Sequence, residues 1–385
     1  MFNFDYYNPT KIIFGKERLA ELRNLIPLNA KVMLLYGGGS VEKFGTLTKI
    51  RKVLGESISL EFGGIEPNPQ YETLMRAVEI ARTKKIDYLL AVGGGSVMDG
   101  TKFVALAACY EGDAKDILFA KSRKQVFTSA LPFGTIVTLS ATGSEMNNGG
   151  VISFGDGKYH FAQDVVFPHF SLLDPELTFT LPKRQIANGI IDTFVHVGEQ
   201  YFTYPAHAMF QDRTAEGMLK SLTELSSKAV EEPKEYDTMA NLMWLATLGL
   251  NGLIGAGVPQ DWTSHMLGHE LTALTGMDHG RTLAIVFPAV LKVLREQKRA
   301  KLLQYARRVW HIMEADEEQS IDFAILKTED FFRSLEVPVR LSEYGYGIAE
   351  IESILQQLKT HGMNKLSETG LVDLDKCREI LTAAI

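Results

Sequence analysis

The sequence has few cysteines and no long apolar run, and both features limit the classes of protein to which it can belong. Only two of the 385 residues are cysteines, Cys109 and Cys377, far apart and in no metal-binding pattern. We therefore expect neither a disulfide framework nor a thiolate metal site. The small number of cysteines fits a protein of a reducing compartment. No apolar run reaches membrane-spanning length, and residues 1–15 lack the uninterrupted apolar core of a signal peptide. The expected location is the cytoplasm, away from any membrane.

Long basic stretches are missing too. The formal net charge is −7, from 40 Lys and Arg against 47 Asp and Glu. The short run of Lys121, Arg123 and Lys124 is interpreted as a solvated loop. Because no basic stretch is long enough to follow a chain of phosphates, nucleic acid is not an expected partner.

What is present is typical of a globular α/β protein. Hydrophobic residues make up 45% and charged residues 23% of a chain long enough for two domains. In the first half, apolar runs alternate with segments of helical periodicity, which predicts a mostly parallel sheet covered on both faces. The expected strands are 31–36, 57–62 and 87–92, followed by shorter β-rich segments at 131–140, 151–154 and 170–175, and the expected helices are 72–85 and 96–110.

The character of the sequence changes near residue 181. From Lys183 onward, β-rich runs give way to long amphipathic segments such as 184–202, 236–254 and 299–313. We therefore expect a nucleotide-type domain over 1–181 and a helical domain over 182–385.

Two triglycine turns each follow an expected strand and precede an expected helix. Gly37, Gly38 and Gly39 precede Ser40, and the second turn reads GGGSVMDGTK, with Gly94, Gly95, Ser96 and Asp99. Glycine lets a phosphate approach the backbone N–H groups at a helix N-terminus, although a tight βα turn alone would look the same. In dinucleotide domains, an acidic residue near such a strand end grips the ribose 2′-OH. Glycine in its place favours NADP over NAD, unless neighbouring residues decide the cofactor.

A hydroxyl-rich segment follows another expected strand. Thr138 and Thr142 lie in TLSATGSE and could line the pyrophosphate and nicotinamide of a cofactor. A plain Ser/Thr loop is the alternative.

Three histidines and one aspartate form a possible metal site. Asp192 and His196 are four residues apart in a helical segment, as are His265 and His269, and His279 follows in a glycine-flanked turn. Imidazole with carboxylate suits Fe²⁺ or Zn²⁺. Each pair alone could instead be an exposed helix pair or a satisfied core pair. A metalloprotease H-E-x-x-H motif is excluded, because position 273 is alanine.

The combination of motifs resembles the iron-containing (group III) alcohol dehydrogenases. GGGSVMDGTK, TLSATGSE, LLDPELTFTLP, the Asp192/His196 pair and HMLGHELTALTGMDHG occur in this order over nearly the whole chain. The sequence is most similar to the branch of NADP-dependent butanol dehydrogenases and broad-range aldehyde reductases. TLSATGSE departs from the TTAGTGSE common in the family, and EMNNGGVIS departs from the diol reductases.

This resemblance implies a fold and a set of site residues. The fold would be a Rossmann-like domain with a parallel sheet plus an all-helical domain, the dehydroquinate synthase-like architecture, assembled as a homodimer. His269 would lie beside the metal as a proton relay or as a group that orients a ligand. The implied metal ligands are Asp192, His196, His265 and His279. The implied cofactor-binding positions are Gly94, Gly95, Ser96, Asp99, Thr138, Thr142 and, within 177–181, Thr178 and Leu181.

The implied activity is metal-dependent hydride transfer between NADP(H) and a short-chain aldehyde or primary alcohol. An NAD-dependent polyol dehydrogenase is the nearer alternative. A dehydroquinate-synthase-like lyase would need many basic residues around a phosphorylated substrate, and the metal-motif region has few, with Arg281 the nearest. A metal- or nucleotide-binding regulatory protein is the non-enzymatic alternative.

Overall fold

The computed structural model describes residues 1–119 and 127–385, and the basic run at 121–124 lies outside them. The chain forms two compact units. Unit 2 comprises 7–182 and 233–251, and unit 1 comprises 1–6, 183–232 and 252–385. The prediction of domains that meet at residue 181 has no independent test and stays a prediction.

Unit 2 is built on a six-stranded sheet in the order β1-β8-β5-β4-β2-β3. Every neighbouring pair in this sheet is parallel, so the predicted α/β class is confirmed. The strands are β1 (Lys11–Phe14), β2 (Val32–Tyr36), β3 (Ile58–Phe62), β4 (Tyr88–Gly93), β5 (Phe133–Val137) and β8 (Phe170–Leu173).

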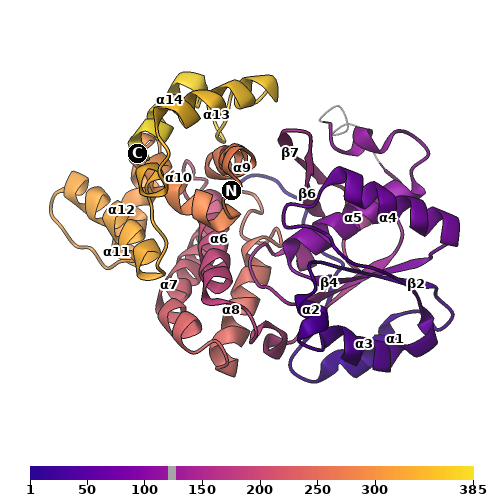
Figure 1. Ribbon diagram of the computed structural model, residues 1–385. Helices are drawn as coiled ribbons and strands as arrows, with labels where there is room; N and C mark the ends of the chain where they lie inside the picture. Colours follow the sequence, from indigo (N-terminus) through magenta and orange to yellow (C-terminus); the bar gives the residue numbers. More distant parts are fainter. Residues whose placement is uncertain (120–126) are drawn as a thin grey trace. The chain divides into compact units, whose positions relative to one another are not determined.

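Alternate residues of the central strands enter two separate cores. Met33 and Leu35 pack with α4 (Tyr71–Lys84) and α5 (Gly95–Cys109), whereas Val32 and Leu34 pack with the core of α1 (Leu22–Leu25) and α3 (Thr46–Leu54). Figure 1 shows α4 and α5 on one face of the sheet and α1, α2 (Ser40–Lys43) and α3 on the other. Burial on both faces explains why β2 and β4 are continuous apolar runs rather than alternating ones.

Two further parts of unit 2 differ from the expectation. β6 (Gly149–Phe154) and β7 (Gly157–Ala162) form a separate antiparallel hairpin, of which only β6 was expected as a strand. α8 (Tyr236–Gly249) ends before residue 254 and belongs to unit 2, where Met243 joins the core of α4 and α5. Helical periodicity indicates a buried face but not the core in which that face is buried.

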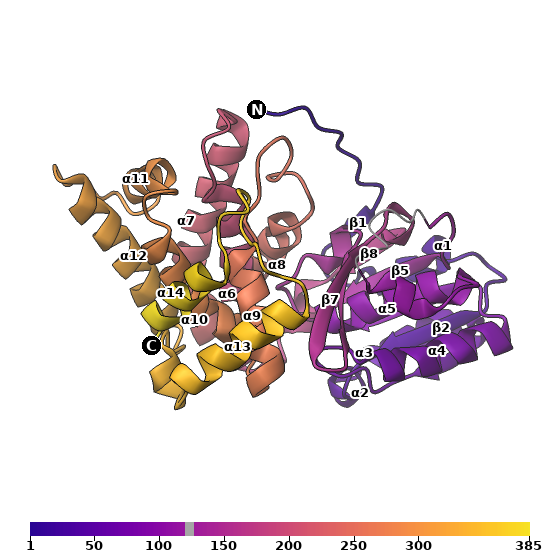
Figure 2. The same ribbon diagram turned by 90° about the horizontal axis from the view of Figure 1, so that it is seen from above.

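Unit 1 is helical. In both views α9 (Thr263–Thr275), α10 (His279–Val293), α13 (Ile348–Thr360) and α14 (Leu374–Ala383) lie side by side (Figures 1 and 2). Their core includes Leu267, Ile285, Leu355 and Cys377. Within 1–119 and 127–385, none of the helices is long and apolar enough to cross a membrane. The helices are α6 (Lys183–Tyr201), α7 (Met209–Glu231), α9 (Thr263–Thr275), α10 (His279–Val293), α11 (Arg299–Arg308), α12 (Glu317–Ser334), α13 (Ile348–Thr360) and α14 (Leu374–Ala383).

Candidate metal and cofactor sites

Asp192 is the centre of the candidate metal site in unit 1. It lies in α6 and is 5% exposed. Its Oδ1 atom lies 3.6 Å from His265 Nε2 and 3.9 Å from His279 Nε2, and the donor atoms of these three residues lie within 4.8 Å of one another. Metal–ligand distances of about 2.0–2.2 Å separate tetrahedral ligand atoms by about 3.4 Å, so these separations fit a single ion.

His196 joins this set by two contacts. Its Nδ1 lies 3.5 Å from Asp192 Oδ1, one turn earlier in α6, and its ring stacks on His265 with centroids 4.4 Å apart. His279 is the first residue of α10, with Asp278 as the N-cap, rather than a residue of the expected turn. His269 stands next to the set, with its ring centroid 4.8 Å from that of His279.

Three of the candidate ligand atoms are buried and make no hydrogen bond within the described residues. Asp192 Oδ1, His196 Nδ1 and His265 Nε2 are buried without a hydrogen-bond partner among the residues that the structure describes. Buried polar atoms without partners are costly and rare in folded proteins. One carboxylate oxygen and imidazole nitrogens that converge in this way fit a divalent cation.

The charges of the site lead to the same conclusion. Burial alone would raise the pKa of the Asp192 carboxyl, but the imidazoles, His196 first, bring it below its usual range. Burial lowers the pKa of His196 to about 4, against the opposing effect of Asp192. Burial would also lower the pKa of His265, but the Glu199 and Asp192 carboxylates raise it to about 9. The buried carboxylates of Asp192 and Glu199 therefore favour a positive charge between them.

Glu199 was missed by the sequence analysis. It lies one turn beyond His196 in α6, is 2% exposed, and contacts His265 Nδ1 through Oε2. The detectable signal was its spacing, because Asp192, His196 and Glu199 succeed one another at four and three residues on one helical face.

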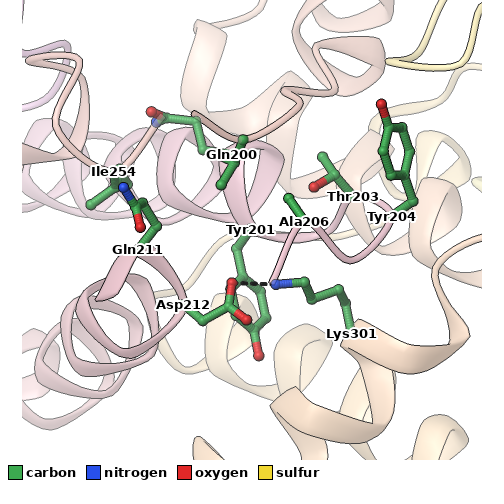
Figure 3. Close-up of a pocket in the computed structure, with 10 residues that line it drawn as sticks. Gln200, Tyr201, Thr203, Tyr204, Ala206, Gln211, Asp212, Ile254 and Lys301 are labelled. Carbon is green, nitrogen blue, oxygen red and sulfur yellow. Dashed lines mark hydrogen bonds and ion pairs between the residues drawn. The ribbon is translucent and has the colours of Figure 1, made fainter. Parts of the chain in front are cut away.

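A separate polar pocket in unit 1 does not include the proposed ligands. Figure 3 shows Lys301 paired with Asp212 beside Tyr201, and Lys301 Nζ lies 4.8 Å from the Tyr201 ring centroid. The charges of Lys301 and Asp212 balance each other there, so this pocket gives no indication of a charged ligand.

The three cofactor segments end neighbouring strands in unit 2. Gly37 follows β2, Gly94 follows β4 and Thr138 follows β5, and these strands are adjacent in the order β5-β4-β2. In open α/β sheets, ligands bind outside the carboxyl ends of the strands. The fold thus brings together three segments that the sequence proposed separately.

The second glycine turn is packed closely against the hydroxyl-rich segment. A Cβ atom on Gly95 would lie 2.5 Å from the Thr142 side chain, and one on Gly94 would lie 3.0 Å from Leu139. Gly94 is the N-cap of α5, so the first N–H groups of this helix have no acceptor within it. These glycines therefore bring Thr142 next to a helix N-terminus suited to a phosphate.

A buried lysine ties α5 to the residues that follow Thr142. Lys102 is 0% exposed, and its Nζ donates to Ser144 Oγ (2.8 Å) and Asn147 Oδ1 (2.7 Å). Asp99, one turn earlier, accepts from Ser144 Oγ (2.6 Å) and from the Val151 N–H (2.9 Å). Both oxygens of Asp99 are thus engaged within the protein, which points to positioning rather than direct contact with a cofactor.

The first glycine turn has two carboxylates in its surroundings that the sequence analysis did not consider. Arg51 binds Glu61 of β3 through Nε and Nη2 (2.7 and 2.6 Å) and Glu42 of α2 through Nη1 and Nη2 (both 2.8 Å). Burial raises the pKa of the Tyr36 hydroxyl, as do Glu61 and Glu42, while Arg51 opposes them. The cluster therefore lies within electrostatic range of Tyr36, the residue just before Gly37.

The remaining expected cofactor positions, Thr178 and Leu181, lie in the turn that follows β8. Thr178 is 0% exposed and donates its hydroxyl to the Pro175 carbonyl (2.7 Å), and Leu181 N–H donates to the Thr178 carbonyl (3.0 Å). The Thr178 hydroxyl proton is therefore used within the turn. The assignment of Thr178 and Leu181 to the cofactor stays a prediction.

Known proteins that are similar to this chain identify its family. Residues 9–175 match the family model "Iron-containing alcohol dehydrogenase", and residues 186–383 match "Fe-containing alcohol dehydrogenase family, C-terminal". The chain is 53% identical to the NADPH-dependent aldehyde reductase YqhD of Escherichia coli over 100% of both chains. It is 39% identical to the probable NADH-dependent butanol dehydrogenase 1 of Bacillus subtilis, over 94% of this chain and 95% of that protein.

Solved structures give the same relationship. A crystal structure of E. coli YqhD superposes with a TM-score of 0.97 at 52% identity, covering 100% of this chain and 99% of that one. The NADH-dependent butanol dehydrogenase A of Thermotoga maritima superposes with a TM-score of 0.94 at 33% identity, covering 100% and 99%. The chain belongs to the iron-containing alcohol dehydrogenase family.

Proposed function

We propose that this oxidoreductase uses NADPH to reduce short-chain aldehydes to primary alcohols, and catalyses the reverse oxidation. The observation that carries the proposal is the 53% identity, over both full lengths, to an aldehyde reductase that uses NADPH. The alternative of a NAD-dependent dehydrogenase is favoured by one specific observation, that other relatives above 30% identity are named as NADH-dependent butanol dehydrogenases.

Asp192, His196, His265 and His279 would hold one divalent metal ion, Fe²⁺ or Zn²⁺. When bound, such an ion acts as a Lewis acid on the substrate oxygen. The residues of the chain supply the ligand atoms, and burial of Asp192, His196 and His265 keeps water away from three of them. The proposal is supported by the three convergent donor atoms that lack another partner.

The glycine turns and hydroxyl-rich segment would hold NADP(H), whose nicotinamide supplies the hydride. The N–H groups at the start of α5 would accept the pyrophosphate, and Thr138 and Thr142 would flank it. Around the 2′-phosphate, Gly38 contributes no carboxylate, and Arg51 binds the carboxylates of Glu42 and Glu61. A dianionic phosphate would then meet less repulsion.

His269 would carry the proton of the reaction. It is 8% exposed and close to His279, and an imidazole exchanges protons near neutral pH. The alternative role, holding a ligand in place, also fits its location.

Three further proposals accompany this function. Residues 1–181 and 182–385 would be the nucleotide and metal domains, the protein would be a homodimer, and it would act in the cytoplasm. Sedimentation at several concentrations would test the homodimer.

One experiment tests the function directly. Purified protein is analysed for Fe and Zn, and a panel of aldehydes is assayed with NADPH and with NADH. We expect about one metal ion per chain and a higher kcat/KM with NADPH. Undiminished turnover in fully metal-free protein would contradict the metal proposal, and a clear preference for NADH would contradict the cofactor proposal.

A further inference from the structure

Glu199 is a buried carboxylate with two directed contacts. Its Oε1 atom accepts the Ser264 N–H (2.5 Å), and its Oε2 atom contacts His265 Nδ1. Ser264 and His265 belong to α9, whereas Glu199 belongs to α6. One carboxylate thus binds both the backbone and the side chain at the start of the helix that carries His265.

The two nitrogens of His265 have different surroundings. Nδ1 meets Glu199, whereas Nε2 lies 3.6 Å from Asp192 Oδ1 and, among residues 1–119 and 127–385, has no hydrogen-bond partner. A carboxylate acceptor at Nδ1 holds a proton on that nitrogen, so Nε2 is the nitrogen of His265 that is left to bind a cation. Nε2 therefore faces the carboxylate at the centre of the proposed ligand set.

Glu199 is itself held firmly. The Asp261 N–H donates to the Glu199 carbonyl (2.8 Å), and the Asp261 carboxylate is bound by Lys298 Nζ (2.6 Å). Lys298 is 2% exposed and also donates to the Phe202 carbonyl just beyond α6 (2.6 Å). The segment that leads into α9 is therefore fixed at Glu199 itself and, through Lys298, just beyond the end of α6, so the carboxylate has little freedom to turn away from His265.

We propose that Glu199 is a positioning residue of the metal centre. It holds His265 in the orientation and tautomer that present Nε2 to the cation, and it supplies the second negative charge of the site. Asp192 and Glu199 together carry two negative charges, which balance one divalent ion. The inference rests on the proposed metal site, and it adds a residue that touches neither substrate nor cofactor.

The test is metal affinity in matched variants. Glu199→Gln keeps the size of the side chain and removes its charge. Glu270→Gln removes the same kind of contact elsewhere, because Glu270 is also buried in α9 and binds the Nδ1 atom of His361 (2.9 Å), a histidine outside the proposed ligand set. Zn²⁺ affinity is measured in the full chain by competition with a chromophoric chelator, alongside the visible spectrum of the Co²⁺-substituted protein.

We expect Glu199→Gln to bind Zn²⁺ about 10–100-fold more weakly than wild type, as loss of such a partner typically does. Its Co²⁺ spectrum should shift, while Glu270→Gln stays within about threefold of wild type with an unchanged spectrum. Equal weakening in both variants, or wild-type affinity in folded Glu199→Gln, overturns the proposal.

Two further measurements keep the result decisive. If Glu199→Gln does not fold, Glu199→Asp withdraws the carboxylate by one methylene but keeps its charge, and unchanged Zn²⁺ affinity in that variant refutes the positioning role. A wild-type protein that binds no stoichiometric metal instead refutes the proposed metal site itself. Failure of the inference and failure of the function are thereby distinguished.

Discussion

The imidazole rings of His196 and His265 stack with their centroids 4.4 Å apart and their planes 25° apart, although the two residues belong to different helices. Two imidazolium ions at this distance would repel each other strongly. The structure avoids this, because burial lowers the pKa of His196 to about 4. At neutral pH His196 is therefore an uncharged imidazole, the form that binds metal.

His265→Ala should remove both bound metal and turnover. The substitution deletes one of the donor atoms around Asp192 and the ring on which His196 stacks. Metal content and NADPH oxidation are measured on the same preparation. His160→Ala, at an exposed position of β7 in the other unit, serves as the control and should retain both. Turnover that survives without metal would refute the metal assignment.

His269→Ala should retain metal and lose rate. Because His269 lies beside the ligand set rather than within it, we expect a metal content close to wild type. The loss of a proton carrier should lower kcat by at least about tenfold, at the mild end for general acid–base catalysis. A kcat equal to that of wild type would exclude the catalytic role. Loss of metal would favour the alternative of a residue that holds a ligand in place.

Gly38→Asp should shift cofactor preference away from NADPH. A Cβ atom at Gly38 would meet nothing within 4 Å among the described residues, and Gly38 is not in the left-handed region, so a side chain fits. We expect kcat/KM for NADPH to fall about tenfold or more through charge repulsion, with a smaller effect on NADH. Gly38→Asn adds nearly the same volume without charge and should change little. An equal loss in both variants would indicate a steric effect.

Arg51→Met should also weaken NADPH selectively. The change frees the carboxylates of Glu42 and Glu61, both of which are now bound by the guanidinium. We expect the Kd of NADP⁺, measured by calorimetry, to rise several-fold while that of NAD⁺ stays nearly constant, and the difference should shrink at high salt. Adding Glu42→Gln and Glu61→Gln to the variant should restore the affinity. If Arg51→Met alone leaves the ratio of the NADP⁺ and NAD⁺ dissociation constants unchanged, this charge effect is excluded.

Lys102→Met should destabilise unit 2, because Asn147 Oδ1 loses a donor and the charge of Asp99 loses its buried counterpart. We expect a cost of about 1–3 kcal/mol, typical of leaving such groups without partners. Adding Asp99→Asn should recover part of this cost in a double-mutant cycle. Strict additivity of the two changes in urea unfolding would mean that the residues are not coupled.

The same lysine gives a dependence of stability on pH. Burial lowers the pKa of Lys102 to about 8, whereas an unfolded lysine titrates near about 10.4. Between these values the unfolded chain binds the additional proton, so stability rises with pH. The Tm of wild type relative to Lys102→Met should therefore increase from pH 8 to pH 10. A constant difference across this range would contradict the shifted pKa.

The sequence by itself determined the fold class, because continuous apolar runs ended by glycine predict buried parallel strands, and β2 and β4 confirm this. It also indicated Asp192 with His196 and His265 with His269, since residues four apart share a helix face. The order of these motifs indicated the family, which the comparisons confirm.

Only the tertiary structure decided which distant side chains meet. Glu199 with His265, Arg51 with Glu42 and Glu61, and the placement of α8 in unit 2 all depend on how helices and strands pack. The periodicity of apolar residues predicts which face of a helix or strand is buried, but it does not predict which other element packs against that face. Buried carboxylates and lysines therefore acquire their roles only when packing brings their partners within hydrogen-bond distance.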